Sequence, residues 1–302
     1  MDELPDRFPD FLGIGATRGG SSWLYRVLSR HPDVWMPPVK ELHFFDKPRE
    51  GERSVGLSHR VLLLRIRDYL TGERRRSTGD SLGATLRWDY HYLFRRRSLA
   101  WYRGLFRPHE GQITGEVTPA YAILDEAVVR RIAAANPELK ALYMLRNPID
   151  RAWSSVVNSL ARKQRRSITT VPDEQVLRKV DAMTRSRRSD YAANIRTWRA
   201  VLGEERLFIG YMEEIKNDPE ELIGRICRFL GICEPNEAVL HSLTEQVNTT
   251  RKFGAPMSPE IRRRLAEGLL PKIEDAAQLL GGYAEHWLAD ARKTLEERQT
   301  ER

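Results

Sequence analysis

The sequence predicts an α/β protein built on a central parallel sheet flanked by helices. Short apolar runs alternate with amphipathic helical stretches, and no fixed-period repeat interrupts this order. One of these runs leads through a Gly/Ser-rich turn directly into a helix, which is typical of such sheets. The 302 residues are expected to form a single domain, and their composition, 41% hydrophobic and 30% charged, is sufficient for an apolar core.

Four apolar runs predict strands, at residues 11–16, 112–117, 139–145 and 207–211. Apolar residues at helical spacing follow the first two runs, as expected if helices separate the strands. These residues are Leu24, Val27 and Leu28 after the first run, and Leu124, Val128 and Ile132 after the second.

The predicted helix that follows residue 211 has the clearest boundaries in the chain. Asp218 is a good N-cap, Pro219 suits the first helical position, and Glu221 is placed to complete a capping-box pair. Gly231 is placed to end the helix. From Ser258 onward the sequence is again helical and ends in a charged tail.

Two Arg-rich stretches, near residues 60–103 and 162–188, are interpreted as surface insertions, because basic runs commonly form solvated faces. The net charge of +8 indicates an anionic partner of some kind. The sequence carries no RNA- or DNA-binding signature and no zinc-finger spacing, so no nucleic-acid partner is expected.

The N-terminal residues are acidic and polar, and no apolar run approaches the ~20 residues that span a bilayer. We therefore expect a cytoplasmic protein with neither a signal peptide nor a membrane span. Cys227 and Cys233 are too few for a disulfide framework or a zinc site, so both are interpreted as packing residues and no metal is expected.

The segment 15–22, Gly-Ala-Thr-Arg-Gly-Gly-Ser-Ser, is predicted to bind a phosphate group. It follows a buried strand and opens a helix, where backbone N–H groups and the helix dipole favour an anion. Its spacing nearly matches the nucleoside-triphosphatase P-loop, but Ser21 stands where that loop has lysine. The strand at 139–145 is followed by Arg146 and not by a Mg²⁺-binding Asp. Both departures argue against ATP or GTP chemistry.

Five segments in order resemble the sulfotransferases that use 3′-phosphoadenosine-5′-phosphosulfate (PAPS), in particular the bacterial and heparan-type carbohydrate enzymes. The segment 17–24 is similar to the 5′-phosphosulfate loop of that family. The others are His31-Pro32 with Lys40-Glu-Leu-His-Phe-Phe45, then Gly115-Glu-Val-Thr-Pro-Ala-Tyr121, Arg146-Asn-Pro-x-x-Arg151 with Ser154, and Asp218-Pro219 through Phe229-Leu-Gly231.

The resemblance implies a role for each matching residue in holding the donor. Arg18 would stabilise the leaving phosphate electrostatically, because an arginine is a poor proton donor. Trp23 matches an aromatic that stacks on adenine, although a core tryptophan is an equal alternative. The donor-binding residues implied by the family are, for the 5′-phosphate, Thr17, Arg18, Gly19, Gly20, Ser21 and Ser22, and, for the 3′-phosphate, Arg146, Ser154, Arg251 and Lys252.

The resemblance also implies a catalytic base, since an acceptor hydroxyl must lose its proton. Glu41 matches the base of the carbohydrate enzymes, and Glu116 is a reserve candidate. Val117 departs from the family, which has a lysine there. The expected activity is in-line transfer of a sulfuryl group from PAPS to a hydroxyl or amine of a saccharide or other small molecule. The alternatives are a P-loop nucleotide kinase or phosphotransferase, and a non-catalytic protein that binds anionic polymers.

Overall fold

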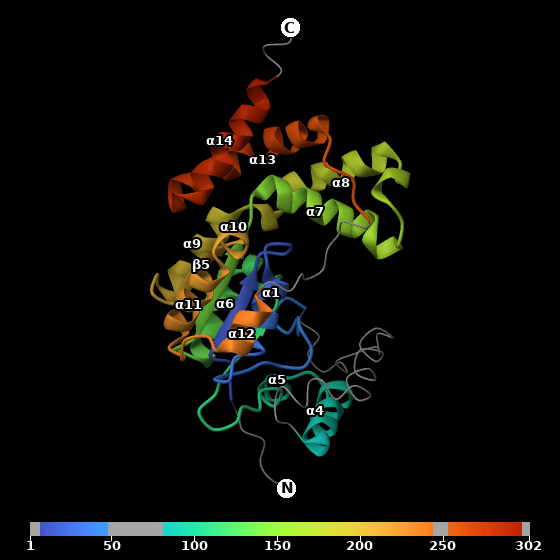
Figure 1. Ribbon diagram of the computed structural model, residues 1–302. Coiled ribbons are helices and arrows are strands. Elements are labelled where there is room, and N and C mark those ends of the chain that lie inside the picture. The colour runs from blue at the N-terminus through green and yellow to red at the C-terminus, as the bar shows by residue number, and fades with distance from the viewer. Residues whose placement is uncertain (1–6, 48–80, 244–252, 298–302) are drawn as a thin grey trace.

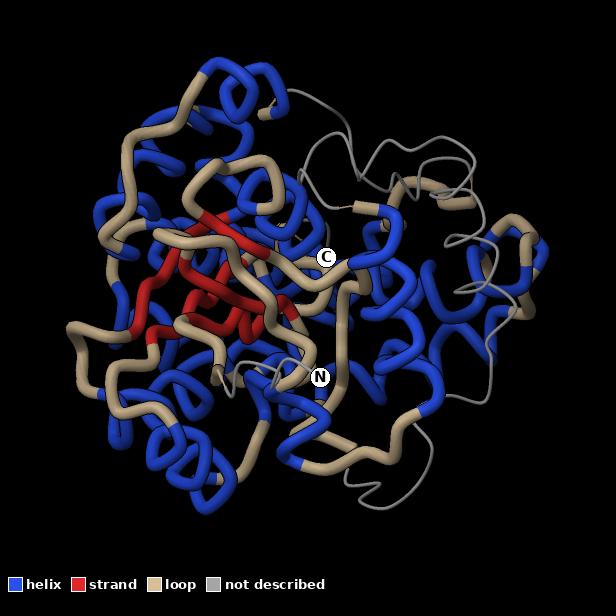
Figure 2. Tube along the Cα trace, turned by 90° about the horizontal axis from the view of Figure 1, so that it is seen from below, coloured by secondary structure: helices blue, strands red, loops and turns tan. Residues whose placement is uncertain are grey.

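The computed structural model describes residues 7–47, 81–243 and 253–297 and contains a five-stranded sheet in the order β2-β3-β1-β4-β5 (Figure 1). Every pair of neighbouring strands is parallel. The strands are β1 (Phe11–Gly15), β2 (Val34–Trp35), β3 (Ile113–Val117), β4 (Lys140–Leu145) and β5 (Leu207–Tyr211). Viewed from below, the strands lie in the interior with helices around them, which confirms the predicted α/β class (Figure 2).

Alternate residues of the central strands face two separate apolar layers, as strand geometry requires. Leu142 and Met144 of β4 join one layer. The helices that cover this face are α1 (Ser21–Leu28), α11 (Pro219–Leu230) and α12 (Glu237–Ser242). The 3-10 turn η1 (Tyr121–Ile123) follows β3, and the short helix α10 (Met212–Asn217) follows β5.

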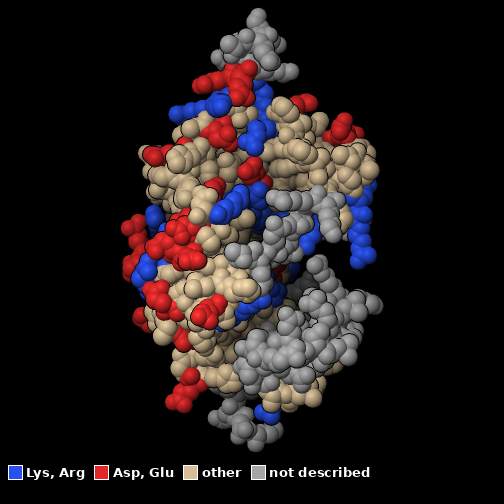
Figure 3. All heavy atoms as spheres, viewed as in Figure 1, with Lys and Arg blue, Asp and Glu red and all other residues tan. Residues whose placement is uncertain are grey.

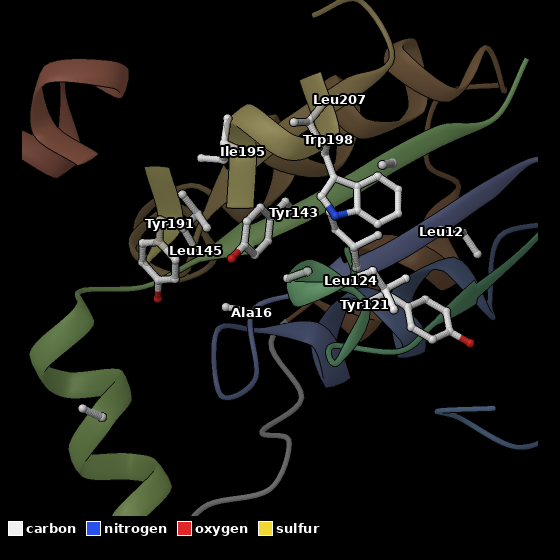
Figure 4. Packing of buried hydrophobic residues seen from close by; sticks show 14 of the residues in the cluster. Leu12, Ala16, Tyr121, Leu124, Tyr143, Leu145, Tyr191, Ile195, Trp198 and Leu207 are labelled. Carbon is white, nitrogen blue, oxygen red and sulfur yellow. The ribbon is translucent and has the colours of Figure 1, made fainter. Parts of the chain in front are cut away.

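The opposite face of the sheet packs against α6 (Glu126–Ala135) and α9 (Tyr191–Leu202). Figure 4 shows Tyr143 of β4 between Tyr191 and Trp198 of α9, and all three side chains are fully buried. The rings of Tyr143 and Tyr191 meet edge to face, with centroids 5.9 Å apart. This packing holds the carboxyl end of β4 in place, and the chain enters the predicted 3′-phosphate motif there.

A group of helices lies beyond the carboxyl ends of the strands (Figure 1). They are α7 (Pro148–Leu160), α8 (Asp173–Arg185), α13 (Pro259–Leu280) and α14 (Tyr283–Glu296), and α13 packs on each of the other three. The guanidinium of Arg264 on α13 pairs with the Asp181 carboxylate of α8 at 2.6 Å. The C-terminal helices predicted from Ser258 onward are confirmed, with Ser258 as the N-cap of α13.

The interpretation of both Arg-rich stretches as surface insertions is wrong for their described parts. Within the first stretch, α4 (Leu82–Phe94) and α5 (Leu99–Arg103) bury Trp88, Trp101 and Tyr102 in the main core. Within the second, α8 buries Val176 and Val180 in the same core. Most of the described arginines near these apolar residues, among them Arg87, Arg95, Arg178 and Arg185, are exposed, whereas Arg97 is buried.

The four predicted strands are confirmed to within one residue, and β2, only two residues long, was not predicted. The Asp218 side chain accepts from the Glu221 N–H, with Pro219 at the first helical position and Gly231 in the left-handed conformation at the end. The expected capping-box contact of the Glu221 side chain is wrong, because Glu221 pairs with Arg228 instead. Cys227 is buried as predicted, whereas Cys233 is exposed. Within the described part of the chain, every helix is too short or too polar to cross a membrane.

Candidate active site

The predicted phosphate loop is a tight turn between β1 and α1. Two of its residues have positive φ, Arg18 at 70° and Gly20 at 107°, and α1 begins directly after Gly20. A side chain at Gly20 would be strained by this φ and would approach Ile215 Cδ1 to 2.6 Å. The Gly19 N–H donates to the Ala16 carbonyl at 2.9 Å. In this conformation the Gly19 amide, predicted to hold phosphate, therefore stabilises the turn itself.

Arginines from three segments meet at this loop. The Arg18 Nε donates to Ser154 Oγ at 2.9 Å, and Arg146 Nη1 donates to the Arg18 carbonyl at 3.4 Å. Burial, followed by the charges of Arg162 and Arg146, lowers the pKa of Arg18 to about 10. Within the described residues, neither Arg18 nor Arg146 contacts a carboxylate. Such a concentration of like charge favours a bound anion.

The sheet topology explains why these residues meet. Arg146 directly follows β4, which lies beside β1, so the phosphate loop and Arg146 leave the same edge of the sheet. Asn147 caps α7 through the Ile149 N–H, and Ser154 is buried on the second turn of that helix. The Tyr191 hydroxyl donates to the Arg146 carbonyl at 2.9 Å and fixes this corner. Ligand sites in open parallel sheets lie at this position, outside the carboxyl ends of the strands.

The predicted base, Glu41, lies on a separate segment that reaches the phosphate loop through Lys40. Lys40 Nζ is 2.8 Å from Glu41 Oε1 and 3.3 Å from Ser21 Oγ. The other carboxylate oxygen, Glu41 Oε2, is 3.5 Å from His43 Nε2, and His43 Nδ1 is 2.8 Å from Asp46 Oδ2. The structure therefore brings the predicted base to the phosphate loop, in a row of alternating charges.

This row of charges sets the protonation of its members. Burial acts to raise the pKa of Glu41, but the hydrogen bond from His43 and the charge of Lys40 outweigh it and lower the pKa to about 2. The hydrogen bonds to Asp46 and then Glu41 raise the pKa of His43 to about 9. Glu41 is therefore ionised and His43 protonated at neutral pH.

Glu116, the reserve base, is fully occupied by structural contacts. Its buried carboxylate accepts from the hydroxyls of Tyr102 at 2.6 Å, Thr118 at 2.7 Å and Tyr121 at 2.9 Å, and from the Leu42 N–H. Burial nevertheless raises its pKa. With four donors around its two oxygens, Glu116 organises the neighbouring segments and has no free position for an acceptor.

Two further positions take part in the core. The Val117 side chain, at the family's lysine position, belongs to the apolar layer under α1, so no charge replaces that lysine at this site. Trp23 is 5% exposed, and its indole N–H donates to the Leu243 carbonyl at 3.4 Å. These are the contacts of a core tryptophan, which was the alternative to adenine stacking. Arg251 and Lys252 lie outside the described residues.

Sequence reasoning missed several side chains at the site. Lys40 was quoted within its motif but given no role, although it bridges Glu41 and Ser21. Arg188 Nη1 approaches Thr17 Oγ1 to 3.5 Å from the second Arg-rich stretch. Arg162 acts electrostatically on Arg18. The space-filling view shows Lys and Arg gathered across the middle of this face, with Asp and Glu more frequent to the left (Figure 3). The arginine excess itself was the available signal.

Comparison with known proteins agrees with this geometry. A model of the sulfotransferase family matches residues 9–235, which is more than half of the chain and contains every described site residue. The chain belongs to this family. It is 29% identical over 229 residues to mouse heparan sulfate glucosamine 3-O-sulfotransferase 6, covering 75% of this chain and 53% of that protein. Mouse heparan sulfate glucosamine 3-O-sulfotransferase 3A1 is 26% identical over 247 residues, covering 77% of this chain and 48% of that protein.

The sulfotransferase chain thus spans about half the length of these curated relatives. Among solved structures it resembles a sulfotransferase from Alicyclobacillus acidocaldarius, with a TM-score of 0.63, 27% identity and coverage of 93% of this chain and 99% of that one. The sulfotransferase domain of the Synechococcus PCC 7002 olefin synthase matches with a TM-score of 0.52 and 18% identity, covering 91% of this chain and 98% of that one. The α/β sulfotransferase fold is therefore established for this chain.

Proposed function

We propose that this chain transfers a sulfuryl group from PAPS to a hydroxyl or amine of a saccharide or another small molecule. The observation that carries the proposal is the meeting of Arg18, Arg146 and Ser154 at the end of the phosphate loop. PAPS is a substrate consumed in each turnover, and its 5′-phosphosulfate and 3′-phosphate are both anions. Two guanidiniums that contact no carboxylate of the described residues fit a donor with two such groups.

Each of these residues has a distinct task in the proposed reaction. Arg18 stabilises the negative charge that develops as the sulfuryl group leaves the 5′-phosphate. Burial, and then the charges of Arg162 and Arg146, lower the pKa of Arg18, and an anion beside it acts in the opposite direction. Arg18 therefore stays charged and acts electrostatically. Arg146 and Ser154 hold the 3′-phosphate, the group that distinguishes PAPS from ATP.

Glu41 is the proposed base, and Lys40 controls its strength. A carboxylate with a pKa near 2 is a weak base while Lys40 and His43 both contact it. Lys40 Nζ is already 3.3 Å from Ser21 Oγ, so a small rotation turns it from Glu41 to an anion on the phosphate loop. Loss of the Lys40 contact raises the pKa of Glu41. Glu41 thereby becomes a better base when the donor site is filled.

The names of the relatives support a class of acceptor. The curated relatives are named as sulfotransferases of heparan sulfate glucosamine. The segment from Lys40 to Phe45 also resembles a segment of heparan-type carbohydrate sulfotransferases. This supports a saccharide acceptor, with a natural product as the second choice. Cytoplasmic location, a single domain over residues 1–302 and independence of metal ions stay predictions.

Adenosine 3′,5′-bisphosphate, the product left by PAPS, is expected to raise the melting temperature far more than Mg²⁺-ATP does. At a hundredfold excess over Kd, the bisphosphate should add about 2.7 kcal/mol to the free energy of unfolding. Thermal unfolding with each ligand, repeated with EDTA, measures this. Equal stabilisation by both nucleotides, or preference for ATP, would contradict the proposal and favour a nucleotide kinase.

Arg146→Ala is expected to weaken binding of the bisphosphate by about 2–3 kcal/mol, the scale of a charge-assisted hydrogen bond. Affinity for adenosine 5′-phosphosulfate, which lacks the 3′-phosphate, should hardly change. Calorimetric titration of both ligands checks this, with Arg178→Ala on the exposed face of α8 as the control. Equal losses for both ligands would mean that Arg146 supports the fold and does not bind the 3′-phosphate.

A further inference from the structure

The segment that carries Glu41 has an unusual backbone. Glu41 has a φ of 66° and His43 a φ of 52°, both in the left-handed region that disfavours side chains. Each such residue costs on the order of 1–3 kcal/mol and persists only where surrounding contacts hold it. Contacts from three other segments hold the backbone around these two residues.

Two neighbouring backbone groups are held by the hydrogen bonds around Glu116. The Leu42 N–H donates to the Glu116 carboxylate, and the Phe44 N–H donates to the Tyr121 hydroxyl at 2.9 Å. These contacts fix the residues on either side of His43. The His43 carbonyl points elsewhere and accepts from Arg97 Nη2 at 2.7 Å.

Arg97 lies in the short link between α4 and α5, within the Arg-rich stretch. It is 6% exposed, whereas its neighbours Arg95 and Arg96 are exposed. Its guanidinium carbon lies 5.1 Å from the ring centre of Trp101 and 5.7 Å from that of Phe44. A guanidinium is costly to bury, and these ring contacts together with the His43 carbonyl offset that cost.

We propose that Arg97 is a positioning residue for sulfuryl transfer, holding the His43 backbone so that His43 and Glu41 stay paired beside the phosphate loop. The catalytic part of this inference rests on the proposed function, because it takes Glu41 as the base. Arg97 does not reach the donor or the acceptor. It acts through the backbone of the segment that carries the base.

The titration of His43 tests the positioning directly and needs no acceptor. Among the described residues, the charged groups facing His43 are Asp46, Glu41 and Lys47 on its own segment, and Arg97 from the α4–α5 link. If Arg97 acted only as a nearby positive charge, Arg97→Gln would raise the pKa of His43. If Arg97 holds the loop, the same change separates His43 from its two carboxylates and lowers the pKa from about 9 towards 6.5.

We expect NMR titration of Arg97→Gln to show at least a tenfold larger acid dissociation constant for His43, about one pH unit. The spectrum of His43→Gln lacks the His43 signal and so identifies it among the signals of the seven histidines. Arg95→Gln should leave the titration unchanged. A pKa of His43 that stays the same or rises in Arg97→Gln would overturn the proposal.

Measurements of turnover distinguish whether Arg97 positions the base or only stabilises the fold. With labelled PAPS and a heparan sulfate oligosaccharide, Arg97→Gln should lower kcat about 10–100-fold and Arg97→Lys less than about fivefold, with bisphosphate affinity unchanged. Trp88→Phe is the stability control, since it removes the indole hydrogen bond to the Leu105 carbonyl in the same region. Equal kcat for Arg97→Gln and Trp88→Phe would contradict positioning. Inactive wild-type protein would count against the proposed acceptor and leave the titration to decide the role of Arg97.

Discussion

Glu41→Gln is expected to lower turnover by roughly 10²–10⁴-fold while the affinity for adenosine 3′,5′-bisphosphate stays near the wild-type value. Glutamine keeps the size and hydrogen-bonding shape of the side chain but cannot take a proton from the acceptor. The donor site is formed by Arg18, Arg146 and Ser154, none of which contacts Glu41. Steady-state kinetics and bisphosphate titration of the same preparation measure the two effects.

The pH dependence of turnover provides a second measurement on Glu41. Because its pKa is lowered to about 2, Glu41 is ionised throughout the neutral range. In kcat/KM for PAPS, which reports the free protein, the acidic limb due to Glu41 should therefore lie below ~pH 4, where a glutamate at its ordinary value is already largely protonated. In kcat the same limb should lie at higher pH, because the bound donor draws Lys40 away from Glu41. Turnover is present above the pKa of Glu41, where the carboxylate can accept a proton, and is lost as the pH falls through that pKa. This limb should be missing in Glu41→Gln.

An exposed glutamate provides the matched control for this substitution. Glu126 on α6 pairs with Arg130 at the surface, so Glu126→Gln should leave kcat unchanged. If Glu41→Gln kept wild-type turnover on its true acceptor, Glu41 would not be the base. The base would then lie outside this row of charges, because His43 is protonated at neutral pH and the four donors around Glu116 leave its carboxylate no free position.

The strands and the bounds of α11 were predictable because their signals are local. A fully buried parallel strand appears as an apolar run, and a helix end appears as a capping residue, a proline or a glycine. The two-residue strand β2 gives no such run. In the first Arg-rich stretch the arginine content predicts a solvated surface, but the aromatic residues Trp88 and Tyr92, which stand at helical spacing, are buried. Leu86, Tyr90 and Phe94 of the same helix have the same spacing and are exposed, so spacing alone does not tell which face of α4 is buried.

The residues of the site were predictable where each of them belongs to a local sequence motif. Arg18, Arg146 and Ser154 each belong to a motif beside a strand end, and the parallel sheet brings those ends together. The contact of Arg188 with Thr17 spans 171 positions and follows from no local pattern. The contact of Arg97 with His43 likewise depends on tertiary packing. The positive φ of Glu41 and His43 could not be predicted either, because neither residue is a glycine.

The electrostatic role of Arg18 leads to the second large expected effect. Arg18→Ala should lower turnover by on the order of 10²–10³-fold, the scale of a lost oxyanion donor. It should also weaken binding of the bisphosphate, since the side chain lies between the phosphate loop and Ser154. Alanine keeps the Cβ atom, so the strain of the positive φ at this position is the same in both proteins.

Arg18→Lys tests whether a positive charge at this position is sufficient without the planar guanidinium. The charge of lysine is placed at a single nitrogen and can be lost as a proton, whereas the charge of arginine is spread over a planar group. If Arg18 acts as a charge, the lysine variant keeps substantial turnover, and the alkaline limb of its pH profile moves to lower pH as the lysine loses its proton. Rapid-quench measurement of the transfer step compares the two variants. Wild-type transfer rates in Arg18→Ala would contradict this role, and Lys40, which also reaches the phosphate loop, would be the next residue to test.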